Sequence, residues 1–296
     1  MRLISLTPAN PLRVLFLLVF AFFLGLTSCD DQDEAPLQNA ISDADVEDVA
    51  TEEQLETTFE DIDLISVEAN DRTEDGDLGG REQMDETDML TRCATITHDK
   101  EAKTITIDFG DGCEGPDGKI RSGIIFISYT KRMFIPGAVL TITLENYTVN
   151  GLAIEGSKTI TNVSEDLQDN VSFNKVLTGG KITWPDGTYA TRDSDKTFTW
   201  YRASNPLLDE VHVTGVANGQ TRRGVVYDME ILSTIIWKRS CRVRGICVPV
   251  QGLKLFTIVD HPDVLVDFGD GECENQITIT KSGESKLVNV DCHKRD

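Results

Sequence analysis

The chain has 296 residues and a formal net charge of −22. Nearly all of this charge lies in residues 30–90, which contain 23 Asp and Glu against 2 Arg, whereas residues 91–296 contain 27 acidic and 24 basic residues. This balance argues against nucleic acid as a partner, because phosphate binding needs clustered Lys and Arg.

The N-terminus has the pattern of a secretory signal. Arg2 and Arg13 precede or border an apolar run, 14–26, that is too short for a comfortable transmembrane helix. The next residues, Leu26–Cys29 (LTSC), resemble the lipobox of bacterial lipoproteins, where the peptidase cuts before the cysteine. The resemblance implies a signal peptide over 1–28 and a covalent lipid, with palmitate-type acyl chains, on Cys29. An ordinary signal peptide with a chance cysteine is the alternative.

The first residues after the predicted cleavage indicate the membrane face. The mature chain would begin CDDQDE, and an acidic stretch directly after the cysteine resembles the surface-export signal of lipoproteins from Bacteroidota-type bacteria. The resemblance implies an outer-membrane lipoprotein facing the cell surface, with the membrane as its partner through the lipid anchor. Retention at the inner membrane and a periplasmic orientation are the competing interpretations.

Residues 29–90 are interpreted as an acidic tether that keeps the body away from the membrane through self-repulsion. A helix is expected within it over roughly 45–69, opened by a capping box of Thr51 and Gln54 and laid with its apolar stripe on the body. Residues 70–88 contain no apolar repeat and are predicted to be loop. The helix prediction rests on apolar residues near helical spacing: Val46, Val49, Leu55, Phe59, Ile62 and Ile65.

Residues 91–296 read as one β domain. Long β-branched runs with period-2 alternation cover 119–132, 138–150, 152–163, 171–202 and 210–239, joined by short turns. Asn150-Gly151, between two such runs, predicts a type I′ hairpin turn. The fold class expected is all-β: a long antiparallel up-and-down meander, as a twisted sheet, sandwich or partly closed barrel, with the N-terminal helix packed on it.

The sequence D-F-G-D-G occurs twice, at 108–112 within TIDFGDG and at 267–271 within LVDFGDG. Alternation makes the preceding residues half-buried strands with the Phe inward, and the glycines supply the positive φ angles of a tight turn. A calcium site is the alternative interpretation, although the EF-hand spacing is absent. Its candidate ligands are Asp108, Asp111, Asp267 and Asp270, with Glu114 and Asp117 near the first copy.

Six cysteines remain besides Cys29, and an even number in an exported chain predicts three disulfides. Because each D-F-G-D-G copy lies between two cysteines, equivalent bonds are expected in the two copies. Zinc is disfavoured, since the cysteines lack the C-x₂-C spacing of zinc sites. The predicted pairs are Cys93–Cys113, Cys247–Cys273 and Cys241–Cys292.

Two resemblances rest on these segments. D-F-G-D-G occurs in PKD-type β modules, but the Trp that usually precedes it is missing here. The wider pattern of TITIDFGDGCEGPDGKIRSG, TITLENYTVNGLAIEG and VDFGDGECENQITIT resembles a family of hypothetical lipoproteins of Bacteroidota-type bacteria with repeated DFGDG-Cys motifs. That resemblance implies location and fold and carries over no catalytic residues.

Catalytic motifs are absent from the sequence. The histidines are scattered singly, and there is no nucleophile elbow, zinc-protease motif, Walker loop or dinucleotide fingerprint. The expectation is therefore a structural or ligand-binding surface module that is not an enzyme and holds no cofactor. A polysaccharide-binding accessory protein or a glycoside hydrolase is the alternative, with strand carboxylates as candidates: Glu145, Glu155, Asp228 and Glu230.

Aromatic residues gather in the middle third of the chain, where they fill a core or stack on sugars. Alternation along 197–201 places Phe198 and Trp200 on one side and Tyr201 on the other. One row of large aromatics is therefore expected to be buried and Tyr201 exposed.

Overall fold

The computed structural model describes residues 41–72, 90–166 and 170–290, and all of them belong to one compact unit, Asn39–Asp296. The predicted signal peptide, Cys29 and Cys292 lie outside the described residues. In the described ranges, no helix combines the length and apolarity needed to cross a membrane.

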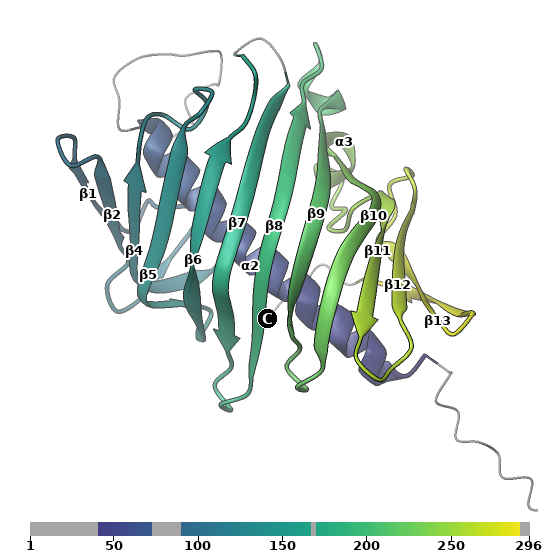
Figure 1. Ribbon diagram of the computed structural model, residues 1–296. Helices are drawn as coiled ribbons and strands as arrows, with labels where there is room; N and C mark the ends of the chain where they lie inside the picture. Colours follow the sequence, from purple (N-terminus) through teal and green to yellow (C-terminus); the bar gives the residue numbers. More distant parts are fainter. Residues whose placement is uncertain (1–40, 73–89, 167–169, 291–296) are drawn as a thin grey trace, which may run out of the picture. The chain divides into compact units, whose positions relative to one another are not determined.

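Fourteen strands form a single antiparallel sheet in which the strands follow one another in chain order (Figure 1). The exception is β3, which pairs with β4 off the main path. The predicted all-β meander is thus confirmed, and its form is one continuous sheet. The strands are β1 (Thr95–Asp99), β2 (Thr104–Asp108), β3 (Cys113–Glu114), β4 (Ile120–Tyr129), β5 (Val139–Val149), β6 (Leu152–Asn162), β7 (Val171–Thr183), β8 (Tyr189–Tyr201), β9 (Glu210–Gln220), β10 (Val226–Lys238), β11 (Gln251–Ile258), β12 (Val264–Asp270), β13 (Gln276–Lys281) and β14 (Glu284–Asn289).

The turns follow from local chemistry. Asn150 and Gly151 join β5 to β6 with φ angles of 50° and 78°, and Val149 pairs with Leu152 across them. Two positive φ angles in a two-residue hairpin loop are the signature of the predicted type I′ turn. Short turns of this kind keep consecutive strands adjacent, which is why the sheet grows in sequence order.

Helix α2 (Asp43–Arg72) is the long helix of the fold and lies across one face of the sheet (Figure 1). It contains the predicted range 45–69, but the predicted capping box is wrong. The hydroxyl of Thr51 donates to the carbonyl of Glu47 inside the helix. The N-cap is Ser42, whose Oγ accepts from the Asp45 N–H while the Asp45 carboxylate accepts from the Ser42 N–H at 2.8 Å.

The core lies between α2 and the face of the sheet that it covers, here called the inner face. Along the helix the predicted apolar stripe is buried, and it meets inward side chains such as Ile107, Ile125 and Val266, each with no more than 1% exposure. Among the described residues, no helix covers the opposite, outer face. Helix residues in the core are Val49, Leu55, Phe59, Ile62, Ile65 and Ala69.

Bulges bend the sheet where glycines occupy strand positions. The register of β4 against β5 shifts between Ser122 and Ile124, at Gly123, whose φ is 81°. A Cβ atom there would stand 2.3 Å from the carbonyl oxygen of Asn146. At Gly215 in β9 a Cβ atom would stand 2.2 Å from the carbonyl oxygen of Asp195. Neighbouring backbones therefore approach more closely at these points than any other residue permits.

Two short helical turns lie at one end of the sheet, and the sequence pattern predicts neither. They are η2 (Pro206–Leu208), between β8 and β9, and α3 (Arg239–Arg242), directly after β10. The backbone N–H of Arg239 donates to the carbonyl of Asp209 at 3.0 Å. The two turns are thus fixed to each other.

Candidate functional site

The two D-F-G-D-G copies share one local structure. Asp108 accepts a hydrogen bond from the Gly110 N–H, and Asp267 accepts one from the Gly269 N–H, both at 2.8 Å. Gly110 and Gly269 have φ angles of 59° and 93°. The structure therefore agrees with the interpretation of both copies as strand followed by tight turn, with the first aspartate of each motif bonded to the turn backbone.

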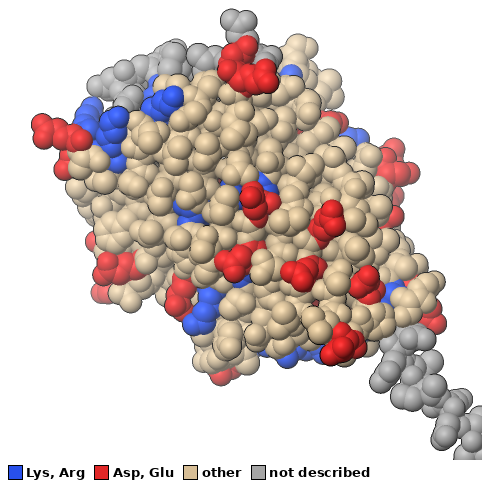
Figure 2. Space-filling view, viewed as in Figure 1, with Lys and Arg blue, Asp and Glu red and all other residues tan. Residues whose placement is uncertain are grey.

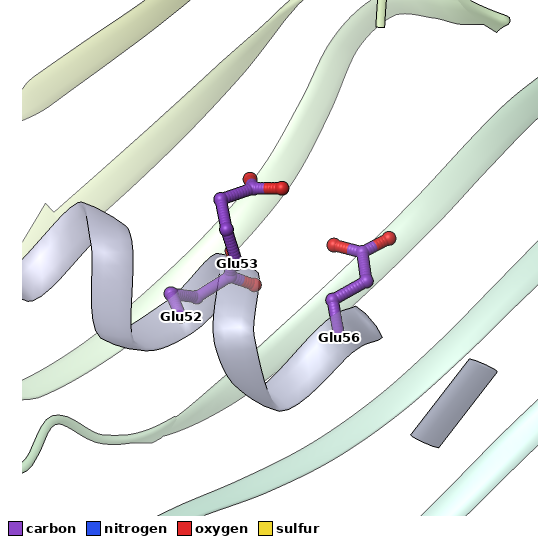
Figure 3. A group of neighbouring side chains, drawn as sticks. All are labelled: Glu52, Glu53 and Glu56. Atoms are coloured by element: carbon purple, nitrogen blue, oxygen red, sulfur yellow. The ribbon is translucent and has the colours of Figure 1, made fainter. Parts of the chain in front are cut away.

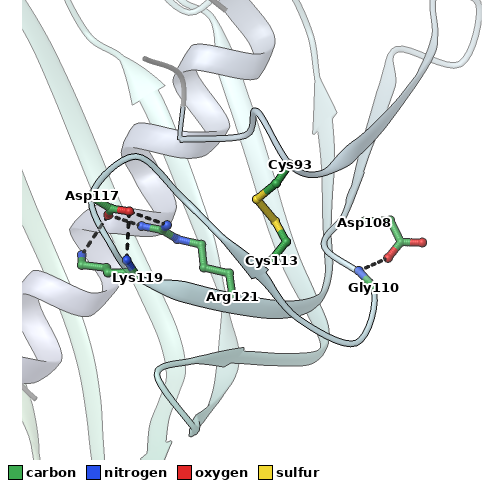
Figure 4. Close-up of a disulfide and its surroundings, with 7 residues drawn as sticks. All are labelled: Cys93, Asp108, Gly110, Cys113, Asp117, Lys119 and Arg121. Atoms are coloured by element: carbon green, nitrogen blue, oxygen red, sulfur yellow. Dashed lines mark hydrogen bonds and ion pairs between the residues drawn. A yellow bond between two sulfur atoms is a disulfide. The ribbon is translucent and has the colours of Figure 1, made fainter. Parts of the chain in front are cut away.

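The acids proposed as calcium ligands do not gather at these turns. Asp111 and Asp270 are exposed, and Asp117 pairs with Arg121 at 2.6 Å (Figure 4). Within the described ranges, the group of three acids whose oxygens lie within 4.8 Å of one another is elsewhere, on α2. The calcium interpretation thus gains no support from geometry.

The predicted bond between Cys93 and Cys113 is confirmed. It links Cys93, two residues before β1, to Cys113, directly after the first D-F-G-D-G turn, with Cα atoms 5.7 Å apart (Figure 4). It closes the β1–β2 hairpin at its open end, within the ordinary range for a disulfide.

The other two predicted pairs are wrong. Cys273 bonds to Cys241, with Cα atoms 5.2 Å apart, and Cys247 is disulfide-bonded but not to Cys273. The reason is sheet geometry. The Val250 N–H donates to the carbonyl of Ile236, and the Gly271 N–H donates to the carbonyl of Val250. The C-terminal ends of β10 and β12 therefore lie on either side of Val250, at one end of the sheet. Helix α3 then carries Cys241 toward Cys273, and the two motif copies differ in their crosslinks.

Most ion pairs of the described residues lie at the contact between α2 and the inner face. Acidic side chains on successive turns of the helix pair with Lys and Arg from strands between β4 and β14 and from loops next to these strands. We call this set the ionic seam. Its pairs are Asp43–Lys286, Asp45–Lys281, Asp48–Arg223, Glu52–Arg192, Glu53–Lys254, Glu56–Lys196, Glu56–Lys254, Asp61–Arg121, Asp61–Lys119, Asp63–Lys158, Asp63–Lys175 and Asp71–Arg132.

The centre of the ionic seam is the group Glu52, Glu53 and Glu56, which project from one turn of α2 (Figure 3). Their carboxylates are close enough to hold a metal ion, but cations of the protein already neutralise them. Lys254 pairs with Glu53 and lies 2.9 Å from Glu56, while Arg192 pairs with Glu52. The arrangement is therefore an ion-pair cluster in which a metal would compete with Lys254.

Burial and partner charges act against each other on the pKa values of this cluster. Burial raises the pKa of Glu56, but the charges of Lys196 and Lys254 outweigh it and lower that pKa below its usual range. Burial lowers the pKa of Lys196 to about 7, which the charge of Glu56 opposes. The pKa of Lys254 is raised, because Glu53 and Glu56 together overcome its burial. The charged form is thus favoured at Glu56 and Lys254 and disfavoured at Lys196.

The C-terminal half of α2 repeats the arrangement. Asp61 accepts from the guanidinium of Arg121, which has no exposed surface and also binds Asp117. Two residues later Asp63 binds Lys158 at 2.8 Å and Lys175 at 2.9 Å. Burial and the charge of Glu56 raise the pKa of neighbouring Glu60.

The interpretation of the acidic segment as a solvated spacer is wrong for residues 43–72, because these acids bind the sheet. Strand alternation is the sequence signal for these ion pairs, because it places cations on the buried side of the strands. Lys158 shares its side of β6 with Ile160, Lys196 shares its side of β8 with Phe198, and Lys254 shares its side of β11 with Phe256. Cations at inward positions demand buried anions, and the acidic helix is their source.

The outer face has a different character. Figure 2 shows it as mostly uncharged surface with separate carboxylates near its middle. Asp193 on β8 and Asp228 on β10 both pair in register with Asn218 on β9, so the two acids flank an amide in one row. Asp195 accepts a hydrogen bond from Asn174 at 2.7 Å.

The four carboxylates considered for glycoside hydrolysis all lie on this open face. Glu145 is exposed on β5, and Glu155 on β6 pairs with Lys181 at 2.8 Å. Asp228 and Glu230 are exposed two residues apart on β10. Neighbours of this kind on one strand are separated by about 7 Å. No hydrogen bond or ion pair brings the side chains of these four residues together at a common site.

The aromatic prediction for β8 is confirmed for Tyr201, but the row that was expected to be buried is only half-buried. Phe198 and Trp200 are half-buried on the inner side, whereas Tyr201 is 42% exposed. The Tyr201 ring lies 4.3 Å from the ring of His212, centroid to centroid, and His212 is bonded to Glu210 at 2.9 Å. This places a small aromatic platform at the end of β8.

Comparison with known proteins returned no match to a protein-family model, a curated protein or a solved structure. The resemblance to a lipoprotein family therefore stays an expectation drawn from the motifs.

Proposed function

We propose that this chain is a lipid-anchored cell-envelope protein whose β body is a binding or structural module and not an enzyme. The observation that carries the proposal is the division of the sheet. Glu56, Lys196 and Lys254, whose pKa values are displaced, are paired with each other across the ionic seam, under α2. Catalysis needs such residues at an accessible site, and the accessible outer face instead offers hydroxyls, amides and separate carboxylates on a rigid scaffold.

The lipid anchor is supported by the lipobox-like LTSC at Leu26–Cys29, directly after the apolar run. Cys29→Ser removes the thiol that would carry diacylglycerol, so the protein should move from the membrane fraction to the soluble fraction. Ser28→Ala keeps a small residue before the cysteine and serves as the control that stays with the membrane. Retention of Cys29→Ser in unchanged amount after a high-salt wash would overturn the anchor.

Surface orientation is a separate part of the proposal, supported by the acidic CDDQDE that follows the predicted cleavage site. An epitope inserted in the loop at Asp260-His261, which is exposed, should be detected by antibody on intact cells. A periplasmic protein of the same strain is the control for leakage. Detection only after permeabilisation would place the body on the periplasmic side.

Glycan binding is a second candidate function, favoured by the exposed Tyr201–His212 ring pair. Sugars stack on aromatic faces that are held in place, and Glu210 fixes His212. Tyr201→Ala should abolish binding to each polysaccharide that the unsubstituted mature chain binds on a glycan array. Tyr189→Ala, at the other end of β8 and 43% exposed, is the matched control. Equal loss of polysaccharide binding in both variants, or no loss in either, would exclude the Tyr201–His212 pair as the glycan site.

A further inference from the structure

One end of the sheet carries exposed apolar and basic side chains together. Leu207 and Leu208 of η2 are 49% and 63% exposed, and Val243 directly after α3 is 64% exposed. Arg239, Arg242 and Arg244 are exposed beside them. We call these six residues the rim patch. Single exposed leucines are ordinary on a protein surface, but leucines grouped with arginines on two adjoining turns are not.

The backbone under the rim patch is fixed. Asn205 caps η2 by accepting from the Leu207 N–H at 3.1 Å. Asp209, which is buried, accepts from the Trp200 indole at 3.0 Å and from the Ala203 N–H at 2.9 Å. Cys241 of α3 is buried and bonded to Cys273. The apolar side chains are therefore held at the surface by a preformed support and cannot simply turn inward.

Tryptophans border the rim patch on its inner side. Val211 of β9 pairs with Trp200 on β8 and with Trp237 on β10, so the two indoles stand in one row, both half-buried. Arg242 lies over the Trp237 ring, 5.2 Å from its centroid. Trp and Arg at the edge of an apolar surface are typical of protein segments that sit at the headgroup level of a membrane.

The charge of this region is opposite to that of the chain. Residues 238–247 contain one Lys, three Arg and no acid. The acids beside η2 are engaged: Asp209 is buried and Glu210 bonds to His212. Glu272 and Glu274 flank Cys273 and thus border the region on the disulfide side. In a protein of net charge −22, a cationic apolar surface is suited to an anionic partner.

We propose that the rim patch docks on a membrane surface that contains anionic phospholipids. The arginines would pair with headgroup phosphates, and Leu207, Leu208 and Val243 would enter the acyl boundary. A polyanionic glycan would satisfy the arginines but give the leucines no apolar surroundings, which is why the lipid is the better partner. The contact deepens the membrane location proposed above and would set the orientation of the β body on it.

The test uses the mature chain from residue 29 with Cys29→Ser, so that no acyl chain contributes. It should cosediment with vesicles of phosphatidylcholine and phosphatidylglycerol in equal parts, and at least tenfold less with phosphatidylcholine alone. Raising the salt concentration should weaken binding, because headgroup charge is screened. Absence of cosedimentation with anionic vesicles would overturn the proposal.

Paired variants identify the surface. Leu207→Ser with Leu208→Ser should lower vesicle affinity about tenfold or more, and Arg242→Gln with Arg244→Gln should lower it by a similar factor and reduce the salt dependence. Val259→Ser with Leu287→Ser, which are 69% and 59% exposed elsewhere, and Lys100→Gln are the matched controls. Equal binding by rim-patch and control variants, each with unchanged circular dichroism, would also overturn it. Because the protein carries no lipid here, failure of this test leaves the Cys29 anchor to be judged by fractionation alone.

Discussion

Strand β8 shows in five residues how the two faces of the sheet differ. Arg192 and Lys196 point to the inner face and are buried, while Asp193 and Asp195, between them, point outward and are exposed. The same alternation that separates apolar from polar residues in most strands here separates cations from anions. The sheet buries its positive charge under an acidic helix and presents negative charge to solvent.

This separation has an energetic consequence. Removing paired charges from water costs free energy, and their attraction offsets the cost only when geometry is good and each charge has a partner. The inner face should therefore be sensitive to loss of any one partner, whereas the outer face should tolerate it. The following predictions test that contrast.

The largest effect is expected from removing one buried cation. Arg192→Met leaves Glu52 buried without its guanidinium, and should lower the free energy of unfolding by about 3–5 kcal/mol. Chemical denaturation with urea measures it. Arg222→Met breaks the Arg222–Asp186 pair, whose side chains are 32% and 54% exposed, and should cost less than about 1 kcal/mol. Equal losses in the two variants would contradict the contrast between buried and exposed ion pairs.

The second-largest effect is expected from low pH, which should weaken the contact between α2 and the inner face. The folded-state pKa of Glu56 is lowered, so its contribution to stability is present above its unfolded value of 4.5 and is lost as pH falls below it. A loss of roughly 2 kcal/mol is expected between pH 5 and pH 3. Glu60, whose folded-state pKa is raised, should instead contribute to stability at low pH and so offset part of this loss. Glu56→Gln should flatten the profile in urea titrations, and an unchanged slope would exclude Glu56 as its source.

Removing both partners should cost far less than removing one. Glu52→Met with Arg192→Met replaces an ion pair by apolar side chains, while Lys254 keeps Glu53 and Glu56 as partners. The double variant should lie within about 1–2 kcal/mol of the original protein, or exceed it in stability. A double-mutant cycle with Glu52→Met gives the coupling. Additive losses would show that the two residues act independently.

The smallest effect is expected on the outer face. Asp228→Asn with Glu230→Gln removes two exposed carboxylates that face solvent on β10. The free energy of unfolding should change by less than about 0.5 kcal/mol. Thermal unfolding followed by circular dichroism is sufficient. A loss comparable to that of Arg192→Met would mean that the outer carboxylates have structural partners.

The elements of the fold follow from local patterns, whereas their cross-connections do not. Period-2 runs and Asn150-Gly151 predict the meander, since neighbouring strands need only short turns to pair. The sequence pattern favours Thr51 over Ser42 as the N-cap because the apolar stripe becomes dense only after Val49. The disulfide from Cys241 depends on α3, which has one turn and no periodicity. The sequence of the helix alone does not predict the ionic seam, because acidic residues on a helix resemble a solvated face unless the inward cations of distant strands are considered with them.

The span of α2 has a consequence for the order of folding. The loops between neighbouring strands have at most 12 residues, so the sheet can grow pair by pair while the chain is being synthesised. The helix precedes every strand in the chain, yet Asp43 binds Lys286, 243 residues later, and Asp61 binds Arg121, only 60 later. Its C-terminal half can dock early, and its N-terminal half must wait for the last hairpin. Helix α2 can therefore complete its contacts with the sheet only after β14 has been synthesised.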